Sequence, residues 1–301
     1  MLRGLNNLER RTAVSTHPGD SITLVTARKL RRITEYLIRR ILVAATHRKA
    51  LSSLKKLRGS RRGQRALVLG NGPSINKLDT EKAQALRVSG LEIIVVNWFP
   101  LSKLERELTP DILVLSDPLM TPDKRHDHRV EELWEYIRCH QNLRIAVPTT
   151  WSKHLKMVGI ETSRVIYFND LPLEGFGKGT DPTKARHYLS MTAYKAVAIA
   201  IYLGYKEIGV LGVDNTMFFG LSVGDDNQLV LADHHFYSKQ REDQNMSAFY
   251  PNGVADYFYD LSNCFLDLRR YFGASTNVFH LDKESIVDAF IKSDCLGVIK
   301  S

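Results

Sequence analysis

The sequence contains few cysteines and no long apolar run. Its three cysteines, Cys139, Cys264 and Cys295, are far apart in a chain of 301 residues. This spacing excludes a disulfide framework and the usual zinc-ligand patterns, and it favours a reducing compartment. No stretch of about 18 apolar residues occurs, so no membrane-spanning helix is predicted. The first residues, MLRGLNNLERR, lack the apolar segment of a signal peptide. We therefore expect a cytoplasmic protein.

Acidic residues are scarce at the N-terminal end of the chain. Residues 1–65 hold 17 Lys and Arg against 3 acidic residues, a net charge of +14. The remaining chain holds 25 basic and 30 acidic residues, a net charge of −5. Such an asymmetry indicates an acidic partner for the basic part, such as anionic lipid, nucleic acid or an acidic protein.

An amphipathic helix is predicted over residues 26–57. Apolar residues recur at three- and four-residue spacing, and arginines cover much of the other side. The pattern fits a helix at an anionic membrane surface, which would make the protein peripheral on the inner face of the membrane. It also fits a helix that packs on the domain and keeps its arginines in water. A basic linker, 59–65, follows, and we divide the chain into an arm at 1–62 and a nucleotide-binding catalytic domain at 63–301.

Short apolar strands alternate with helical patterns from residue 66 onward. Strands are predicted at 66–69, 93–96, 112–115, 144–147, 165–168, 208–213 and 277–280, and helices near 79–89, 129–141, 151–158, 184–203, 256–272 and 284–293. This alternation predicts an α/β fold, with a Rossmann-like, mostly parallel sheet covered by helices on both faces. Segment 215–255 is polar with little periodicity, which is typical of a long functional loop.

The first strand leads into a glycine-containing turn. Residues 70–74 read Gly-Asn-Gly-Pro-Ser, so Asn71, Gly72, Pro73 and Ser74 follow the strand directly. Glycines permit close approach of the backbone to a ligand, and an Asn or Ser side chain supplies hydrogen-bonding groups. The spacing matches neither a Walker A loop nor a complete dinucleotide fingerprint. The turn is therefore either a ligand site or a tight strand-to-helix connection.

Polar residues also follow three other predicted strands. Asn97 follows the second strand, Ser116-Asp117 follows the third, and Asp214-Asn215 follows the strand at 208–213. Ligands of parallel α/β sheets bind outside the carboxyl ends of the strands. Four such strand ends together favour one binding site over four independent turns.

Together these segments resemble one enzyme superfamily. The resemblance rests on GNGPS at 70–74, Asn97 before Trp98-Phe99, Asp117-Pro118, and the predicted helix and strand at 192–214, which include LGYKEIGVLGVD. They are similar to bacterial lipooligosaccharide sialyltransferases of glycosyltransferase family 42 and to "domain of unknown function 115" proteins. The latter include motility accessory factors that glycosylate flagellin and archaeal 6-hydroxymethylpterin diphosphokinase-like proteins. The resemblance covers roughly residues 65–295.

The resemblance implies a set of nucleotide contacts. In the sialyltransferases, the matching positions hold the CMP part of CMP-sialic acid, which implies Asn71, Asn97, Asp117 and Thr192 here, with Ser190 close enough to compete with Thr192. Asp117 departs from the pattern, because that position can be Asn in the sialyltransferases. An acid there suits a ribose hydroxyl but repels phosphate unless it holds a metal ion.

The resemblance also implies a histidine base in the late polar loop. The loop offers His234 and His235 within Asp-His-His-Phe-Tyr, and His187 is a reserve candidate. A histidine can deprotonate an acceptor hydroxyl near neutral pH. The spacing from Asp214 differs from that of the sialyltransferases, so the pair is equally consistent with a solvated loop.

Three functions remain as hypotheses. The first is a glycosyltransferase that moves a sialic-acid-like sugar from a CMP donor to a glycan or protein acceptor in surface-polysaccharide or glycoprotein synthesis, with no metal or other cofactor required. The second is a Mg-ATP-dependent diphosphokinase, in which Asp117 with Asp214 or Asp233 would hold Mg²⁺. The third is a non-catalytic nucleotide-sensing or nucleic-acid-binding protein that uses the basic arm. The net negative body argues against a nucleic-acid groove.

Overall fold

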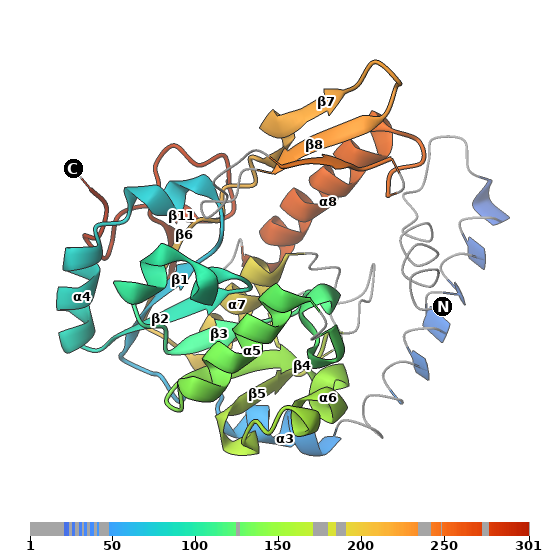
Figure 1. Ribbon diagram of the computed structural model, residues 1–301. Helices are drawn as coiled ribbons and strands as arrows, with labels where there is room; N and C mark the ends of the chain where they lie inside the picture. The colour runs from blue at the N-terminus through green and yellow to red at the C-terminus, as the bar shows by residue number, and fades with distance from the viewer. Residues whose placement is uncertain are drawn as a thin grey trace.

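The computed structural model describes most of the chain. The described residues are 21–23, 26–27, 30–31, 33–34, 37–38, 41, 48–124, 127–170, 180–184, 191–233, 242–247, 249–272 and 277–300. They form one central sheet with helices on both faces, and a small separate sheet at the upper end in Figure 1. The predicted fold class is confirmed.

The central sheet has eight strands in the order β11-β10-β6-β1-β2-β3-β4-β5. Every neighbouring pair is parallel. The strands are β1 (Arg65–Leu69), β2 (Leu91–Val96), β3 (Ile112–Val114), β4 (Arg144–Pro148), β5 (Val165–Phe168), β6 (Glu207–Leu211), β10 (Val278–His280) and β11 (Ile291–Lys292). Their carboxyl ends therefore share one edge of the sheet.

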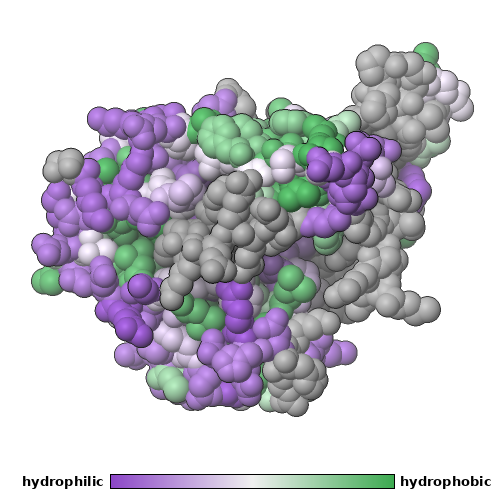
Figure 2. Space-filling model, turned by 45° about the horizontal axis from the view of Figure 1, so that its top comes forward, coloured by the Kyte–Doolittle hydropathy of each residue, from purple (hydrophilic) through white to green (hydrophobic). Residues whose placement is uncertain are grey.

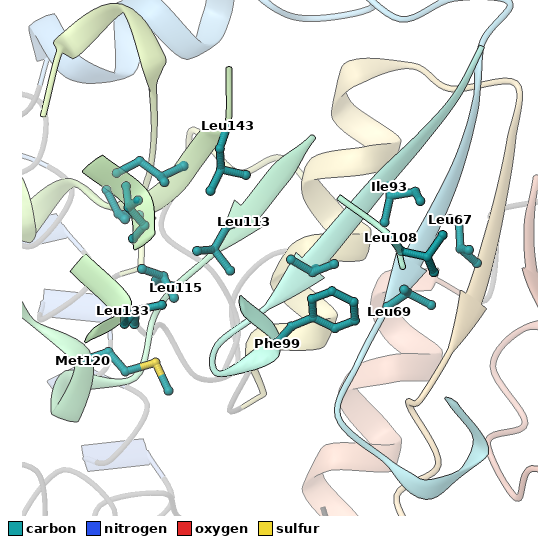
Figure 3. Close-up of a cluster of buried hydrophobic side chains, with 14 of the residues drawn as sticks. Leu67, Leu69, Ile93, Phe99, Leu108, Leu113, Leu115, Met120, Leu133 and Leu143 are labelled. Atoms are coloured by element: carbon teal, nitrogen blue, oxygen red, sulfur yellow. The ribbon is translucent and has the colours of Figure 1, made fainter. Parts of the chain in front are cut away.

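Alternate strand residues face two buried layers. On β1, Ala66 and Val68 face one layer, and Leu67 and Leu69 face the other. The first layer is covered by α3 (Arg48–Lys56), α7 (Thr192–Leu203) and α8 (Val254–Phe272), and the second by α4 (Thr80–Val88), α5 (His128–Cys139) and α6 (Ser152–Met157). Figure 3 shows part of the second layer. A sheet buried on both faces explains the nearly continuous apolar strands of the sequence.

The strand order reverses beside β1. From β1 the chain adds β2, β3, β4 and β5 in one direction, and α7 then carries it back to β6 on the other side of β1. In open α/β sheets, ligands bind at this type of reversal, outside the carboxyl ends of the two strands. The fold therefore points to the loops that follow β1 and β6.

Two sequence predictions are wrong. The helix predicted at 284–293 is absent: Asp282 and Ser285 accept backbone hydrogen bonds from Glu284 and Val287, which holds the segment in turns before β11. Segment 215–255 is not one long loop. It contains a 3-10 helix, η8 (Met217–Gly220), and an antiparallel sheet of β7 (Leu221–Val223), β8 (Leu229–Asp233) and β9 (Glu242–Asn245).

Exposed apolar side chains lie in the small sheet and in the segments next to it. Figure 2 shows a largely hydrophilic face that also carries an apolar patch. Among the exposed apolar residues in this part of the chain are Phe219, Val223 and Phe249. Strand β9 reads Glu-Asp-Gln-Asn, so only backbone pairing with β8, and not apolar alternation, marks it as a strand.

The last part of the predicted arm packs on the sheet. Leu51 and Leu54 of α3 are buried, and the backbone N–H of Gly59 donates to the Tyr202 carbonyl. Arg61 forms an ion pair with Glu92.

Every described position between residues 22 and 41 is helical. The domain boundary at residue 62 stays a prediction. Within the described residues, none of the helices has the length and apolar character needed to cross a membrane.

Candidate functional site

Three glycines join the loops that follow β1 and β6. The N–H of Gly70 donates to the Leu211 carbonyl, and the N–H of Gly72 donates to the Gly212 carbonyl, both at 2.8 Å. A Cβ at Gly70 would lie 2.1 Å from the Gly212 oxygen, and one at Gly72 would lie 2.4 Å from Oδ2 of Asp214. The glycines are thus required for contact between the two loops, whereas the sequence predicted close approach to a ligand.

Ser74 and Asp214 also connect the loops that follow β1 and β6. The N–H of Ser74 donates to Oδ2 of Asp214 at 2.9 Å, and the N–H of Gly212 donates to the Ser74 hydroxyl at 2.9 Å. Both side chains are buried. Pro73 is exposed and begins the 3-10 helix η1 (Pro73–Lys77). Ser74 therefore holds the Asp214 carboxylate in a fixed direction.

Several buried polar atoms at this edge have no hydrogen-bond partner among the described residues. They are Oδ1 of Asn71 after β1, Oδ1 of Asn97 after β2, Oδ1 of Asp214 after β6, and both Oδ1 and Nδ2 of Asn215. A buried polar atom without a partner costs about 1–3 kcal/mol. Because native proteins satisfy nearly all such atoms, this cluster is placed to hydrogen-bond to water or to a polar ligand.

Two of these asparagines adopt left-handed backbone conformations. Asn97 has φ of 50° and Asn215 has φ of 54°. Non-glycine residues rarely adopt such angles, although Asn tolerates them best, and they recur at functional sites. Asn215 stands at one of the four predicted strand ends but was not included among the predicted nucleotide contacts. Its position beside Asp214 at the same strand end was the signal that could have identified it.

A second polar group lies after β3. The hydroxyls of Ser116 and Thr192 are 2.8 Å apart, and Nζ of Lys195 donates to the Ser116 oxygen at 3.0 Å. Thr192 is the first residue of α7. Asp117 is half-buried, and its carboxylate accepts from the N–H of Leu119 to cap the 3-10 helix η4 (Pro118–Met120).

A buried histidine supports the β6 end of the site. Nε2 of His280 lies 3.1 Å from the Val213 carbonyl, which can only accept, and Nδ1 lies 3.1 Å from the carbonyl and 3.2 Å from the N–H of Asp282. Nε2 therefore carries the hydrogen and donates. Burial lowers the pKa of His280, although hydrogen bonding and the carboxylates of Asp214 and Asp282 act in the opposite direction. A neutral His280 thus fixes the residue before Asp214.

The described structure brings together seven of the predicted residues at one edge. These are Asn71, Gly72, Ser74, Asn97, Asp117, Thr192 and Asp214, with Pro73 beside them. Ser190, His187, His234 and His235 lie outside the described residues. Among the residues that are described, no group of three or more His, Cys, Asp or Glu side chains could hold a metal ion.

Comparisons with known proteins add little to this geometry. No protein-family model matches the chain, and no curated protein matches it. Among solved structures, the chain is similar to the MAf glycosyltransferase of Magnetospirillum magneticum AMB-1, with 17% identity and a TM-score of 0.37. The match covers 72% of this chain and 37% of that one, so the chain spans little more than a third of that protein.

Proposed function

We propose that this protein is a glycosyltransferase that binds a nucleotide-activated sugar at the carboxyl edge of β6, β1 and β2. The supporting observation is the cluster of buried, unpartnered side-chain atoms of Asn71, Asn97, Asp214 and Asn215. Most of these atoms are acceptors, which suits ribose hydroxyls and the exocyclic amine of a base. Their place at the reversal of the strand order is where such sheets bind nucleotides.

The donor in this proposal is a CMP-activated, sialic-acid-like sugar. This choice rests on the GNGPS turn and the helix–strand segment at 192–214, through which the sequence resembles the sialyltransferase-like superfamily. The acceptor is a glycan or a protein in surface-polysaccharide or glycoprotein synthesis. The proposed nucleotide contacts are Asn71, Asn97, Asp117, Thr192, Asp214 and the competing Ser190, and Gly72, Pro73 and Ser74 form the turn that positions Asn71 and Asp214.

The proposed reaction needs a base and a stabilised leaving group. His234 or His235 removes the proton of the acceptor hydroxyl while the oxygen attacks the anomeric carbon and the bond to the nucleotide phosphate breaks. Hydrogen-bond donors near the start of α7 stabilise the charge on the departing phosphate. A histidine base predicts an ionisation near neutral pH in the rate profile.

The test follows nucleotide release from CMP-sialic acid in the presence of a panel of glycan acceptors. We expect turnover by the wild type, and a loss of about 10²–10⁴-fold in whichever of His234→Ala and His235→Ala removes the base. Donor affinity should change little in that variant. His128→Ala, an exposed histidine of α5, is the matched control. Full turnover in both variants would place the base elsewhere, and no consumption of any CMP-, UDP- or GDP-sugar would refute glycosyl transfer.

A diphosphokinase acting with Mg-ATP is the second candidate, and the buried Oδ1 of Asp214 is the observation in its favour. A carboxylate oxygen is a good Mg²⁺ ligand. Asp117, its expected partner, already uses its carboxylate to cap η4, so the described residues fit a ribose hydroxyl better than a metal ion. Transfer of diphosphate from ATP to a pterin alcohol, dependent on Mg²⁺, would favour this candidate.

The N-terminal helix is proposed to bind an anionic membrane surface. Leu30, Ile33, Leu37 and Ile41 recur on one helix face, and all four are exposed. The same segment is strongly basic. An apolar stripe beside cationic side chains is the pattern of a helix that lies in the membrane interface. This would place the enzyme as a peripheral protein on the cytoplasmic face of a membrane.

A further inference from the structure

A buried lysine stands beside the proposed nucleotide site. Lys195 lies in the first turn of α7 and is 6% exposed. Its Nζ is 2.8 Å from Oδ1 of Asp170, which follows β5, and donates to the Ser116 hydroxyl, which follows β3. One ammonium group thus connects the carboxyl ends of two strands that flank β4. Lys195 is nearly buried, whereas the Asp170 carboxylate is partly exposed. A largely buried ion pair contributes little to stability compared with apolar side chains of similar volume, so this pair points to a role in the site.

The contact with Lys195 leaves one hydroxyl hydrogen of Ser116 and Thr192 without an acceptor among the described residues. An ammonium group only donates, so the Ser116 oxygen accepts from Lys195. Ser116 and Thr192 have two hydroxyl hydrogens between them, and their 2.8 Å contact uses one. The second hydrogen needs an acceptor, and within the described residues neither hydroxyl has a further partner. Both residues are 7% exposed, so this donor is aimed from a nearly buried position.

The surroundings of this donor favour an anion. The backbone N–H groups at the start of a helix carry partial positive charge. The described N-cap residue of α7, Met191, makes no side-chain cap, and the first turn holds no acidic residue. The hydroxyl hydrogen and the helix start therefore both suit an acceptor with several lone pairs. The acceptor atoms of Asn71, Asn97 and Asp214 suit the opposite, donor-bearing part of a nucleotide.

We propose that Lys195 is a positioning residue for the phosphate of the bound nucleotide. With Asp170 holding it in place, Lys195 donates to the Ser116 oxygen and so orients Ser116 to donate to Thr192, which leaves the Thr192 hydroxyl hydrogen to donate to a phosphate oxygen. The nucleoside then lies over β6, β1 and β2, and the phosphate lies toward Ser116 and the start of α7, with the Asp117 carboxylate turned to the Leu119 N–H of η4. This inference rests on the nucleotide site of the proposed function and adds the residue that sets its phosphate contact.

Calorimetry with a nucleoside monophosphate and its matching nucleoside tests the inference. CMP and cytidine are used first, followed by the AMP, UMP and GMP pairs. In the wild type we expect the monophosphate to bind about 10-fold or more tightly than the nucleoside, the usual effect of a hydrogen bond to a charged group. Lys195→Met should reduce this ratio to near one and leave nucleoside affinity unchanged. Lys206→Met, an exposed lysine at the amino end of β6, should keep the wild-type ratio.

Two further variants separate positioning from packing. Thr192→Val keeps the side-chain shape and removes the hydroxyl, so it should also lower the ratio of monophosphate to nucleoside affinity. The double variant Thr192→Val with Lys195→Met should lower this ratio no further than either single variant does. If Lys195→Met does not fold, Lys195→Met with Asp170→Asn removes both charges together.

Three results would overturn the assignment of Lys195. They are an unchanged ratio in a folded Lys195 variant, an unchanged ratio in Thr192→Val, and an equal loss of nucleoside and nucleotide affinity. A wild type that binds no nucleotide would refute the proposed function as well, whereas normal nucleotide binding with an unchanged ratio refutes only the role of Lys195.

Discussion

At the scale of single residues, Asp214 combines a structural and a binding role. One carboxylate oxygen accepts from the Ser74 N–H and joins the loops after β1 and β6. The other oxygen is buried without a partner in the described chain. Because the first bond fixes the direction of the second oxygen before a ligand arrives, less conformational freedom is lost on binding. The same arrangement explains why position 72 must be glycine, since any Cβ there would displace Asp214.

His280 should make the stability of the protein depend on pH below about 6.5, the ordinary pKa of histidine. Burial lowers the pKa of His280 in the folded state. As the pH falls through 6.5, the unfolded chain takes up a proton that the folded chain does not bind. The free energy of unfolding should therefore decrease as the pH falls in this range.

Urea unfolding of the wild type and His280→Gln between pH 7.5 and 5 measures this effect. Glutamine can still donate from its amide toward the Val213 carbonyl but does not titrate, so the slope with pH should be smaller in the variant. Equal slopes for the two proteins would contradict the account of His280 as a buried neutral donor.

At the scale of secondary-structure elements, α3 belongs to the folded body although its sequence continues the basic arm. Leu54 is fully buried against the layer that contains α7, and Leu51 is nearly so. The N–H groups of Gly59 and Arg61 then donate to carbonyls at the end of α7, Tyr202 and Leu203. The amphipathic pattern at 26–57 thus has two structural contexts, because its last turns are buried while the described apolar residues before them are exposed.

Leu54→Ala should lower the free energy of unfolding by about 2–5 kcal/mol, because it removes buried methyl groups and leaves a cavity. Ser53→Ala, at an exposed position of the same helix, is the control and should change stability by no more than about 0.5 kcal/mol. Denaturant unfolding of both variants provides the comparison. A loss below 1 kcal/mol in Leu54→Ala would show that α3 is not part of the core.

Removal of residues 1–47 should abolish binding to anionic vesicles and preserve the fold, because α3 remains. Each basic residue near an anionic surface contributes on the order of 1 kcal/mol. Sedimentation with phosphatidylserine-containing and neutral vesicles measures the effect, and Leu37→Gln in the full chain tests the apolar face without changing the charge. Unchanged sedimentation of the shortened chain with anionic vesicles would exclude the arm as the membrane contact.

At the scale of the whole molecule, the position of the site follows from the order of the strands. The chain builds the sheet outward from β1, returns through α7, and continues from β6 on the other side. Only this reversal places the polar residues after β6 beside those after β1. Asn97 extends the same row because β2 is the other neighbour of β1.

The sequence predicted the strands well because they are buried on both faces and read as apolar runs. It predicted that polar residues at four strand ends form one site, but not which of these strands are neighbours, since strand order is a tertiary property that local patterns do not contain. Strand β9, Glu-Asp-Gln-Asn, was missed because backbone pairing alone forms it. The buried pair of Lys195 and Asp170 was missed because the two residues are 25 positions apart and lie on different elements.

The most direct test of the nucleotide site is a thermal-shift panel of CMP, CDP, UDP, GDP, AMP and ATP, each with and without Mg²⁺. A ligand at 100 times its Kd stabilises the native state by about 2.7 kcal/mol, which raises the Tm measurably. We expect at least one nucleotide, with CMP first, to raise the Tm of the wild type. The same nucleotide should raise the Tm of Asn76→Ala, an exposed asparagine of the same loop, and should have little effect on Asn71→Ala. No shift with any nucleotide, or equal shifts in both variants, would contradict the assignment of the site.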